Sequence, residues 1–499
     1  MSTELTRRNV LKGLATGAGA VVAWSPLAQS WVTKAGATPA GSVPIPPLDG
    51  TLETTPEVIA GFTGDFGRLI EQTPMAVLRP GSVQDVVKMV RYARCNDLKI
   101  AMNGQAGTPD QLESHSNYGQ ALVQRGIAID ANSLRTIHSI GADSADVDGG
   151  VTWAQLVNEA AAVGKTPPVL TDFLHLTVGG TVSVGGIGGG IQSFGTQADT
   201  ITKLQVVTGA GNLVTCSATQ RAALFNAVLA GAGQCGIIVR ATVKLIPLQT
   251  NALVFNLFYD DLATYMTDQT TVLDDGRFTY QEGQIVPKPD GSGWRYMMEV
   301  ASYYTPPNTP DQAALLAGLS DNRPSAVIVD LPYLQWVFRV DPIMGFLKAN
   351  GFWAEAHPWV SLIVPASKTE AFINQVVAQL APTDLGVGLA PFYPFKTAKI
   401  TRPLFALPQP NEPVAFVLSL LRFPFPGFPG IPGMVAQNRT FFDAAVAVGG
   451  KRYNIGAVPD LTPADWRRHY APKFLLFKLA KAIFDPDNVL TPGQGIFPT

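Results

Sequence analysis

The sequence predicts an α+β protein with two domains. Between Thr73 and Ile246, short apolar runs typical of strands alternate with amphipathic stretches typical of helices. From about Asn251 onward the composition shifts toward aromatic residues and prolines, and the glycine-rich loops of the first region do not recur. A chain of 499 residues is long enough to form two large domains, each with its own core.

The elements of the first region follow from local patterns. Residues 75–78 form an apolar run, and Ser82 precedes a stretch with valines at helical spacing, which predicts a strand followed by a helix. Apolar runs at 99–102 and 126–129 predict two strands around a glycine-containing loop. Further along, the patterns predict a helix over 153–163, a hairpin from 204–208 and 213–216, and a strand over 237–246.

The composition excludes several classes of function. Hydrophobic residues make up 46% of the chain and charged residues 15%, so enough apolar surface is available for folding. The net charge of −2 gives no sign of the basic surface that nucleic acid requires. The 3 cysteines and 5 histidines are scattered and lack the spacing of a metal site or a disulfide framework. We therefore expect neither a metal nor a nucleic-acid partner.

The N-terminus has the pattern of an export signal. Arg7 and Arg8 precede an apolar stretch at 13–24, which is followed by small residues. This stretch is shorter than the roughly 20 apolar residues that a membrane span needs. We interpret residues 1–37 as a twin-arginine-type signal peptide. This interpretation predicts a periplasmic or extracellular protein without a membrane span.

A glycine-rich segment at 177–190 is the clearest local sign of a ligand site. Its glycine density argues against a packed strand or helix. Glycine also lets backbone N–H groups approach a ligand closely, as they do in nests that hold pyrophosphate. The spacing differs from the G-x-G-x-x-G pattern of Rossmann dinucleotide sites. A flexible loop or a glycine-rich sheet edge is the structural alternative.

Several motifs, in a consistent order, point to one family. Residues 170–181 read LTDFLHLTVGGT, which is similar to W-T-D-Y-L-x-L-T-V-G-G-T, and residues 115–121 read HSNYGQA, similar to H-S-x-x-G-Q-A. Further similar segments lie at 194–217, 224–238, 280–283, 356–359 and 484–494. Together these segments resemble the cytokinin dehydrogenases, which belong to the vanillyl-alcohol-oxidase (PCMH-type) flavoproteins.

The resemblance implies a domain organisation and a cofactor. It implies a PCMH-type FAD-binding domain at 55–250, a sheet-and-helix substrate (cap) domain at 251–450, and a return of 451–499 to the FAD domain. In the family the histidine of the H-S-x-x-G-Q motif is bonded to the 8α-methyl group of the flavin, so covalent FAD through His115 is expected. Relative to the family, segment 108–114 is inserted before this histidine. A changed anchoring of the flavin is therefore the alternative.

The resemblance also implies roles for individual residues. Asp172 matches the family's catalytic aspartate, a proton acceptor, and Glu282 matches a glutamate at the mouth of the substrate channel. Judged without the family, Asp172 would cap a turn or a helix end, and Glu282 would be an ordinary exposed carboxylate. The residues expected to contact FAD besides His115 are Ser116, Gln120, Asn103, Gly104, Gln105, Ala106, Gly107, Thr177, Gly180, Ser183, Ile187, Ile238, Tyr453 and Gln494.

The identity of the substrate is less well defined. Leu170, Val184 and Ile400 stand where the family carries tryptophan, asparagine and tryptophan, so aromatic side chains that would enclose an adenine are partly missing. The leading hypothesis is a dehydrogenase of a cytokinin-like N6-alkenyl adenine, with oxygen or a quinone as electron acceptor. The alternative within the same fold oxidises an allylic, aromatic or sugar alcohol. The alternative of a different class is a non-catalytic flavin-binding envelope protein, against which the presence of both His115 and Asp172 argues.

Overall fold

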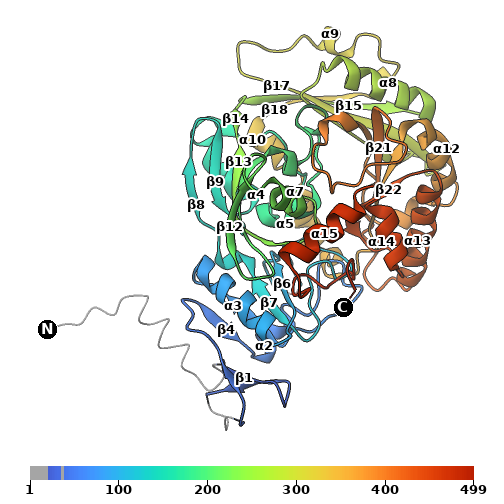
Figure 1. The fold of residues 1–499 in the computed structure, drawn as a ribbon. Helices are drawn as coiled ribbons and strands as arrows, with labels where there is room; N and C mark the ends of the chain where they lie inside the picture. The colour runs from blue at the N-terminus through green and yellow to red at the C-terminus, as the bar shows by residue number, and fades with distance from the viewer. Residues whose placement is uncertain (1–20, 35–38, 109, 499) are drawn as a thin grey trace.

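The computed structural model describes residues 21–34, 39–108 and 110–498 (Figure 1). Helices and strands are mixed along the chain and form separate sheet systems, which confirms the α+β prediction. The predicted signal at 1–37 falls mostly outside the described residues, including Arg7 and Arg8. Its described part forms the hairpin of β1 (Val21–Ser25) and β2 (Ser30–Thr33), which pairs with β3 (Val43–Pro44).

The first region contains two main sheets. One has the order β4-β5-β7-β6, in which β5, β7 and β6 run parallel, as strands linked by crossover connections do. The other is antiparallel with the order β12-β11-β13-β9-β8. The bounds are β4 Thr51–Glu53, β5 Ala76–Arg79, β6 Ile100–Asn103, β7 Ile127–Asp130, β8 Ile137–Ile140, β9 Ser144–Asp148, β11 Ile201–Val207, β12 Leu213–Ser217 and β13 Ile237–Lys244. A two-stranded ladder joins β10 (Lys165–Thr166) to β14 (Ile246–Pro247).

The glycine-rich segment contains a helix, so the expectation that it excludes one was wrong. α5 (Val178–Val184) begins at Thr177, whose side chain accepts a hydrogen bond from the N–H of Gly180, and ends at Gly185 with φ +124°. Glycine is needed here for close packing, because a Cβ on Gly179 would lie 2.9 Å from the carbonyl oxygen of Gly149. The glycines therefore let a short helix approach the antiparallel sheet closely.

The second region is built on two antiparallel four-stranded sheets. Their orders are β16-β17-β15-β18 and β20-β21-β19-β22, and an isolated bridge between Gln284 and Pro391 joins them. Helices α8, α12 and α13 contribute most of the helical buried residues of this region's core, with Leu316 of α9 (Gln312–Leu316) added, and Figure 1 shows these helices around the sheets. The bounds are β15 Asn251–Tyr259, β16 Tyr280–Pro287, β17 Trp294–Tyr304, β18 Val327–Pro332, β19 Val360–Pro365, β20 Phe392–Lys396, β21 Val414–Leu420, β22 Lys451–Gly456, α8 Leu262–Asp275, α12 Ala366–Val377 and α13 Ile431–Ala447.

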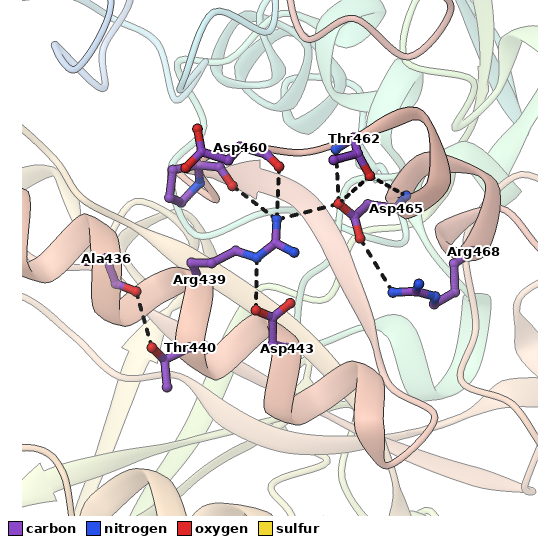
Figure 2. Close-up of polar contacts among 9 residues, drawn as sticks. Ala436, Arg439, Thr440, Asp443, Asp460, Thr462, Asp465 and Arg468 are labelled. Carbon is purple, nitrogen blue, oxygen red and sulfur yellow. Dashed lines mark hydrogen bonds and ion pairs between the residues drawn. The ribbon is translucent and has the colours of Figure 1, made fainter.

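The chain returns to the first region after β22, which still pairs with β19 of the second. Arg439 of α13 holds the segment in which the chain passes from the second region back to the first. It donates to the carbonyl oxygens of Pro459 and Asp460 and forms ion pairs with Asp443 and Asp465 (Figure 2). Asp465 and Thr462 form the capping box of the next helix. That helix, α14 (Pro463–His469), and then α15 (Phe474–Phe484) pack on the core of the first region.

The remaining helices connect or flank these sheets. Ser82 stands at the N-cap of α3 (Val83–Cys95) as predicted, although its hydroxyl donates to Asp49 rather than capping the helix. No helix among the described residues is both long and apolar enough to cross a membrane. The other helices are α2 Pro56–Ala60, α4 Trp153–Ala161, α6 Ile191–Phe194, α7 Ala222–Val228, α9 Gln312–Leu316, α10 Tyr333–Val337 and α11 Asp341–Ala349.

Candidate active site

A first cavity of about 160 Å³ lies in the first region, against the glycine-rich helix α5. It is lined by the loop after β6, the segment that carries His115, the start of α5 and the start of β13. The structure brings most of the predicted cofactor-binding residues together here. These are Asn103, Gly104, Gln105, His115, Ser116, Gln120, Thr177, Gly180, Ser183 and Ile238.

Polar groups without partners line this cavity, which fits a polar ligand. Asn103 Nδ2, Gln105 Oε1, His115 Nε2 and Ser116 Oγ are buried and make no hydrogen bond to the described protein. Buried polar groups are rarely left unsatisfied, because each costs about 1–3 kcal/mol. FAD carries the phosphate, ribityl and ring atoms that could satisfy them. The residues present therefore fit the cofactor that the family motif implies.

The described residues of the inserted segment, 108 and 110–114, fold back toward Ala106, and His115 stays on the cavity wall. Ala106 and Glu113 form an antiparallel bridge, with N–H···O distances of 2.8 and 3.3 Å. The turn between them is held from the second region, because the indole of Trp353 donates to the carbonyl oxygen of Leu112 and Lys348 forms an ion pair with Glu113. The insertion is thus a small hairpin that leaves His115 on the cavity wall.

His115 lies in an aromatic box. Its ring stacks on the Phe173 ring, with 4.7 Å between the ring centres. The centres of the Trp359 ring, which is edge-on to it, and of the Phe66 ring lie at 4.9 and 5.3 Å. Burial, with a smaller contribution from His357, lowers the pKa of His115 to about 3. The imidazole is therefore neutral at physiological pH, and its unpartnered Nε2 is free to form a bond.

Five predicted cofactor residues do not line the first cavity. Ala106 and Gly107 form the base of the inserted hairpin instead. Gln494 donates to the carbonyl oxygen of Asn117 and so ties the C-terminal segment to the His115 loop. The Tyr453 hydroxyl accepts a hydrogen bond from the N–H of Gly186 at 2.9 Å, and Ile187 packs in the same apolar cluster. Tyr453, Ile187 and Gln494 therefore support the glycine-rich segment and the histidine loop.

A second cavity, of about 420 Å³, contains the predicted proton acceptor. Asp172 lines it together with Leu170, and segment 170–183 continues from there to the wall of the first cavity. The side chain of Asp172 is 38% exposed. Much of the lining is aromatic and comes from both regions: Phe194, Phe278, Tyr280, Tyr303, Tyr333 and Trp336. The cavity therefore lies where the two regions meet.

The motifs did not identify Arg339, which is the residue that contacts Asp172 most closely. Its Nη2 lies 2.6 Å from Asp172 Oδ1 and 3.1 Å from Glu299 Oε2. Glu282, predicted at the channel mouth, is buried rather than exposed, and burial raises its pKa well above the ordinary value, with Asp172 adding to the rise. The available signal was an arginine just after the apolar segment Tyr333–Val337, which alone predicts no site.

Two of the three positions that differ from the family line cavities: Leu170 lines the second and Val184 the first. Ile400 lines neither cavity and packs, as Val184 also does, against an apolar cluster with members from both regions. Aliphatic side chains thus stand at all three positions, although other rings line the second cavity.

Comparison with known proteins identifies two family models along the chain. Residues 74–217 match the model of an FAD binding domain. Residues 289–497 match the model described as cytokinin dehydrogenase 1, FAD and cytokinin binding. The first match covers the loop after β6, the His115 segment and α5, and the second covers Arg339, Tyr453 and Gln494.

Full-length relatives agree with these models. An uncharacterized oxidoreductase, ORF5 in the fasciation locus of Rhodococcoides fascians, is 36% identical over 447 residues, which cover 89% of this chain and 99% of that protein. Cytokinin dehydrogenase 2 of Arabidopsis thaliana is 32% identical over 486 residues, or 90% and 94% of the two chains. Cytokinin dehydrogenase 8 of Oryza sativa subsp. indica is 32% identical over 497 residues, which cover 90% of this chain and 92% of that protein. The chain belongs to the cytokinin dehydrogenase family and is an FAD-dependent oxidoreductase.

Proposed function

We propose that the protein oxidises a carbon–nitrogen bond in a small planar amine, with a cytokinin-like N6-alkenyl adenine as the nominal substrate. The substrate C–H bond breaks and its electron pair leaves as hydride, while the adjacent N–H bond loses its proton to a carboxylate oxygen of Asp172. A C=N bond forms in the product. FAD, when bound, supplies the hydride acceptor at N5.

The observation that carries this proposal is the placement of Asp172. Its carboxylate opens into a cavity large enough for a small aromatic molecule, and one continuous segment links it to the cavity of His115. The ion pair with Arg339 favours the ionised carboxylate, which is the form that can accept a proton. The aromatic lining supplies flat apolar surfaces for a planar substrate.

The proposed cofactor site uses the residues of the first cavity. The unpartnered atoms of Asn103, Gln105 and Ser116 would pair with FAD, and the neutral imidazole of His115 would carry the covalent link. A tether suits an exported enzyme, which cannot recover a lost cofactor from the cytoplasm. Oxygen or a quinone is the proposed final electron acceptor.

The experiment that tests the function is anaerobic reduction of the flavin. Purified yellow protein is mixed without oxygen with N6-isopentenyl adenine, and the loss of flavin absorbance is followed. Bleaching by this amine supports the proposal. No bleaching by the amine, together with bleaching by one of a panel of allylic, aromatic and sugar alcohols, would contradict it.

Alcohol oxidation is the second candidate function. The observation that favours it is the aliphatic character of Leu170 and Ile400, which stand where the family has tryptophan. An O–H proton can pass to Asp172 in the same way as an N–H proton, with a C=O bond forming instead. The comparison of amine and alcohol substrates therefore decides between the two functions without changing the role of Asp172.

We also propose export to the periplasm or the cell exterior through a twin-arginine signal. Replacing both Arg7 and Arg8 by lysine should leave flavin-loaded, active protein inside the cell, because this route reads the guanidinium pair. The measurement is flavin fluorescence and activity in cytoplasmic and exported fractions. A control variant with lysine at Arg135, far from the signal in the sequence, should be exported normally. Unchanged export of the double variant would contradict the proposal.

A further inference from the structure

Arg339 is clamped at the centre of a cluster of acidic and phenolic side chains. It follows α10, and its Nη2 donates to Asp172 Oδ1 at 2.6 Å, to the Tyr280 hydroxyl at 2.5 Å and to Glu299 Oε2 at 3.1 Å. The guanidinium carbon lies 4.0 Å from the centre of the Trp336 ring, which stacks beneath it. The indole of Trp336 in turn donates to the Tyr303 hydroxyl at 3.1 Å. Contacts from both sides thus fix the position of the guanidinium.

The register of β16 against β17 places two glutamates opposite each other. Glu282 of β16 pairs directly opposite Glu299 of β17 in the antiparallel ladder. Two like charges directly opposite each other destabilise a sheet, and both side chains are buried. With Asp172 the cluster contains three carboxyl groups, and Arg339 is the cation that contacts it. All three therefore cannot be ionised without leaving uncompensated buried charge.

The geometry distributes the charges unequally. Asp172 is partly exposed and contacts the guanidinium, whereas Glu282 is buried and its carboxyl lies near the hydroxyls of Tyr280 and Tyr393. Burial raises the pKa of Glu282 well above the ordinary value and also raises that of Glu299, and Arg339 opposes both shifts. Burial therefore favours the protonated form of the two glutamates, while the guanidinium lies against the partly exposed Asp172 carboxylate.

We propose that Arg339 is a positioning residue for the reaction: it offsets the negative charge of the cluster and holds the Asp172 carboxylate oriented toward the second cavity, while Glu282 holds a proton. This inference rests on the proposed function, in which Asp172 accepts the substrate proton. The groups that face Asp172 are Arg339 from the turn after α10, Tyr280 and Glu282 from β16, Glu299 from β17 and Tyr393 from β20. Removing the cation leaves Asp172 and the two glutamates without the positive charge that offsets them, so the cluster as a whole binds protons more readily.

The first test is the pH dependence of anaerobic flavin reduction in Arg339→Gln. We expect the acidic limb of the rate profile to move to higher pH, so that on this limb the rate at a fixed pH falls tenfold for each unit of displacement. Arg339→Lys keeps the charge but is shorter and lacks the planar group that stacks on Trp336, so it should lie between parent and Arg339→Gln. Arg323→Gln, which removes an exposed arginine paired with Asp321, is the matched control and should keep the parent profile. A lower rate with an unmoved limb would overturn the proposal.

The second test needs no substrate, so it separates this inference from the proposed function. The folded-state pKa of Glu282 and Glu299 already exceeds the unfolded value of 4.5, and loss of Arg339 should raise it further. Such groups stabilise the fold fully below pH 4.5 and lose that contribution as pH rises through the folded-state value. The melting temperature of Arg339→Gln should therefore continue to fall to a higher pH than that of the parent or Arg323→Gln. A decline that ends at the same pH in all three proteins would overturn the charge distribution, whether or not a substrate reduces the flavin.

Discussion

Replacing Asp172 by asparagine is expected to slow anaerobic flavin reduction by ~10²–10⁴-fold, the usual range for loss of a general base. Asparagine keeps the shape of the side chain but cannot accept the substrate proton as the hydride leaves. The variant should still bind flavin, because Asp172 lines the second cavity and not the first. It should also lose the acidic limb of the pH–rate profile that titration of the aspartate produces.

Two controls separate chemistry from folding in this experiment. Thermal unfolding should show a folded Asp172→Asn protein, because Arg339 keeps its contact with Glu299. Asp341→Asn is a matched variant: Asp341 pairs with His175 and its side chain is 35% exposed, against 38% for Asp172. Normal flavin reduction is expected for Asp341→Asn. If Asp172→Asn reduces its flavin as fast as the parent, Asp172 has a structural role only.

Local patterns were sufficient for the regular strands of the first region. The run at 75–78 became β5 (Ala76–Arg79) and the run at 237–246 became β13 (Ile237–Lys244), because both strands are largely buried and their apolar residues are contiguous or alternate. α5 was missed because glycine content was read as a local property. Its helix depends on the approach of Gly179 to Gly149, a contact between segments distant in sequence.

The residues of the candidate site likewise fall into two groups: those that local motifs predicted and those that depend on contacts between distant segments. Motif residues such as Asn103, Thr177 and Ile238 meet at the first cavity, because each stands at or next to the end of an element: Asn103 ends β6, Thr177 is the N-cap of α5 and Ile238 is the second residue of β13. Arg339 could not be predicted, since its partners lie on three separate elements and only the register of Glu282 against Glu299 creates the need for a cation. The burial of Glu282 likewise follows from packing between the two regions, not from its neighbours in sequence.

Replacing His115 by alanine is expected to abolish covalent attachment of the flavin. In the parent, acid-precipitated protein should remain yellow, and a flavin-bearing peptide should contain His115. The ring is neutral, because burial holds the pKa of His115 near 3, and Nε2 has no hydrogen-bond partner among the described residues. With FAD bound, Nε2 would bond to the 8α carbon: the methyl group would lose one proton, the imidazole its N–H proton, and the two electrons released would pass to the electron acceptor.

Two other histidines, His175 and His138, provide the controls. His175 pairs with Asp341 at 3.0 Å and His138 with Asp148 at 2.7 Å, so each has a ring nitrogen already engaged. His175→Ala should keep all of its covalent flavin, although its ring lies 5.3 Å from Phe173 of the aromatic box. A parent protein that releases all flavin into the acid supernatant would exclude a tether. Flavin attached to His138 or His175 would show that the hairpin at 108–114 redirects the anchoring, despite the bridge between Ala106 and Glu113 that keeps His115 on the cavity wall.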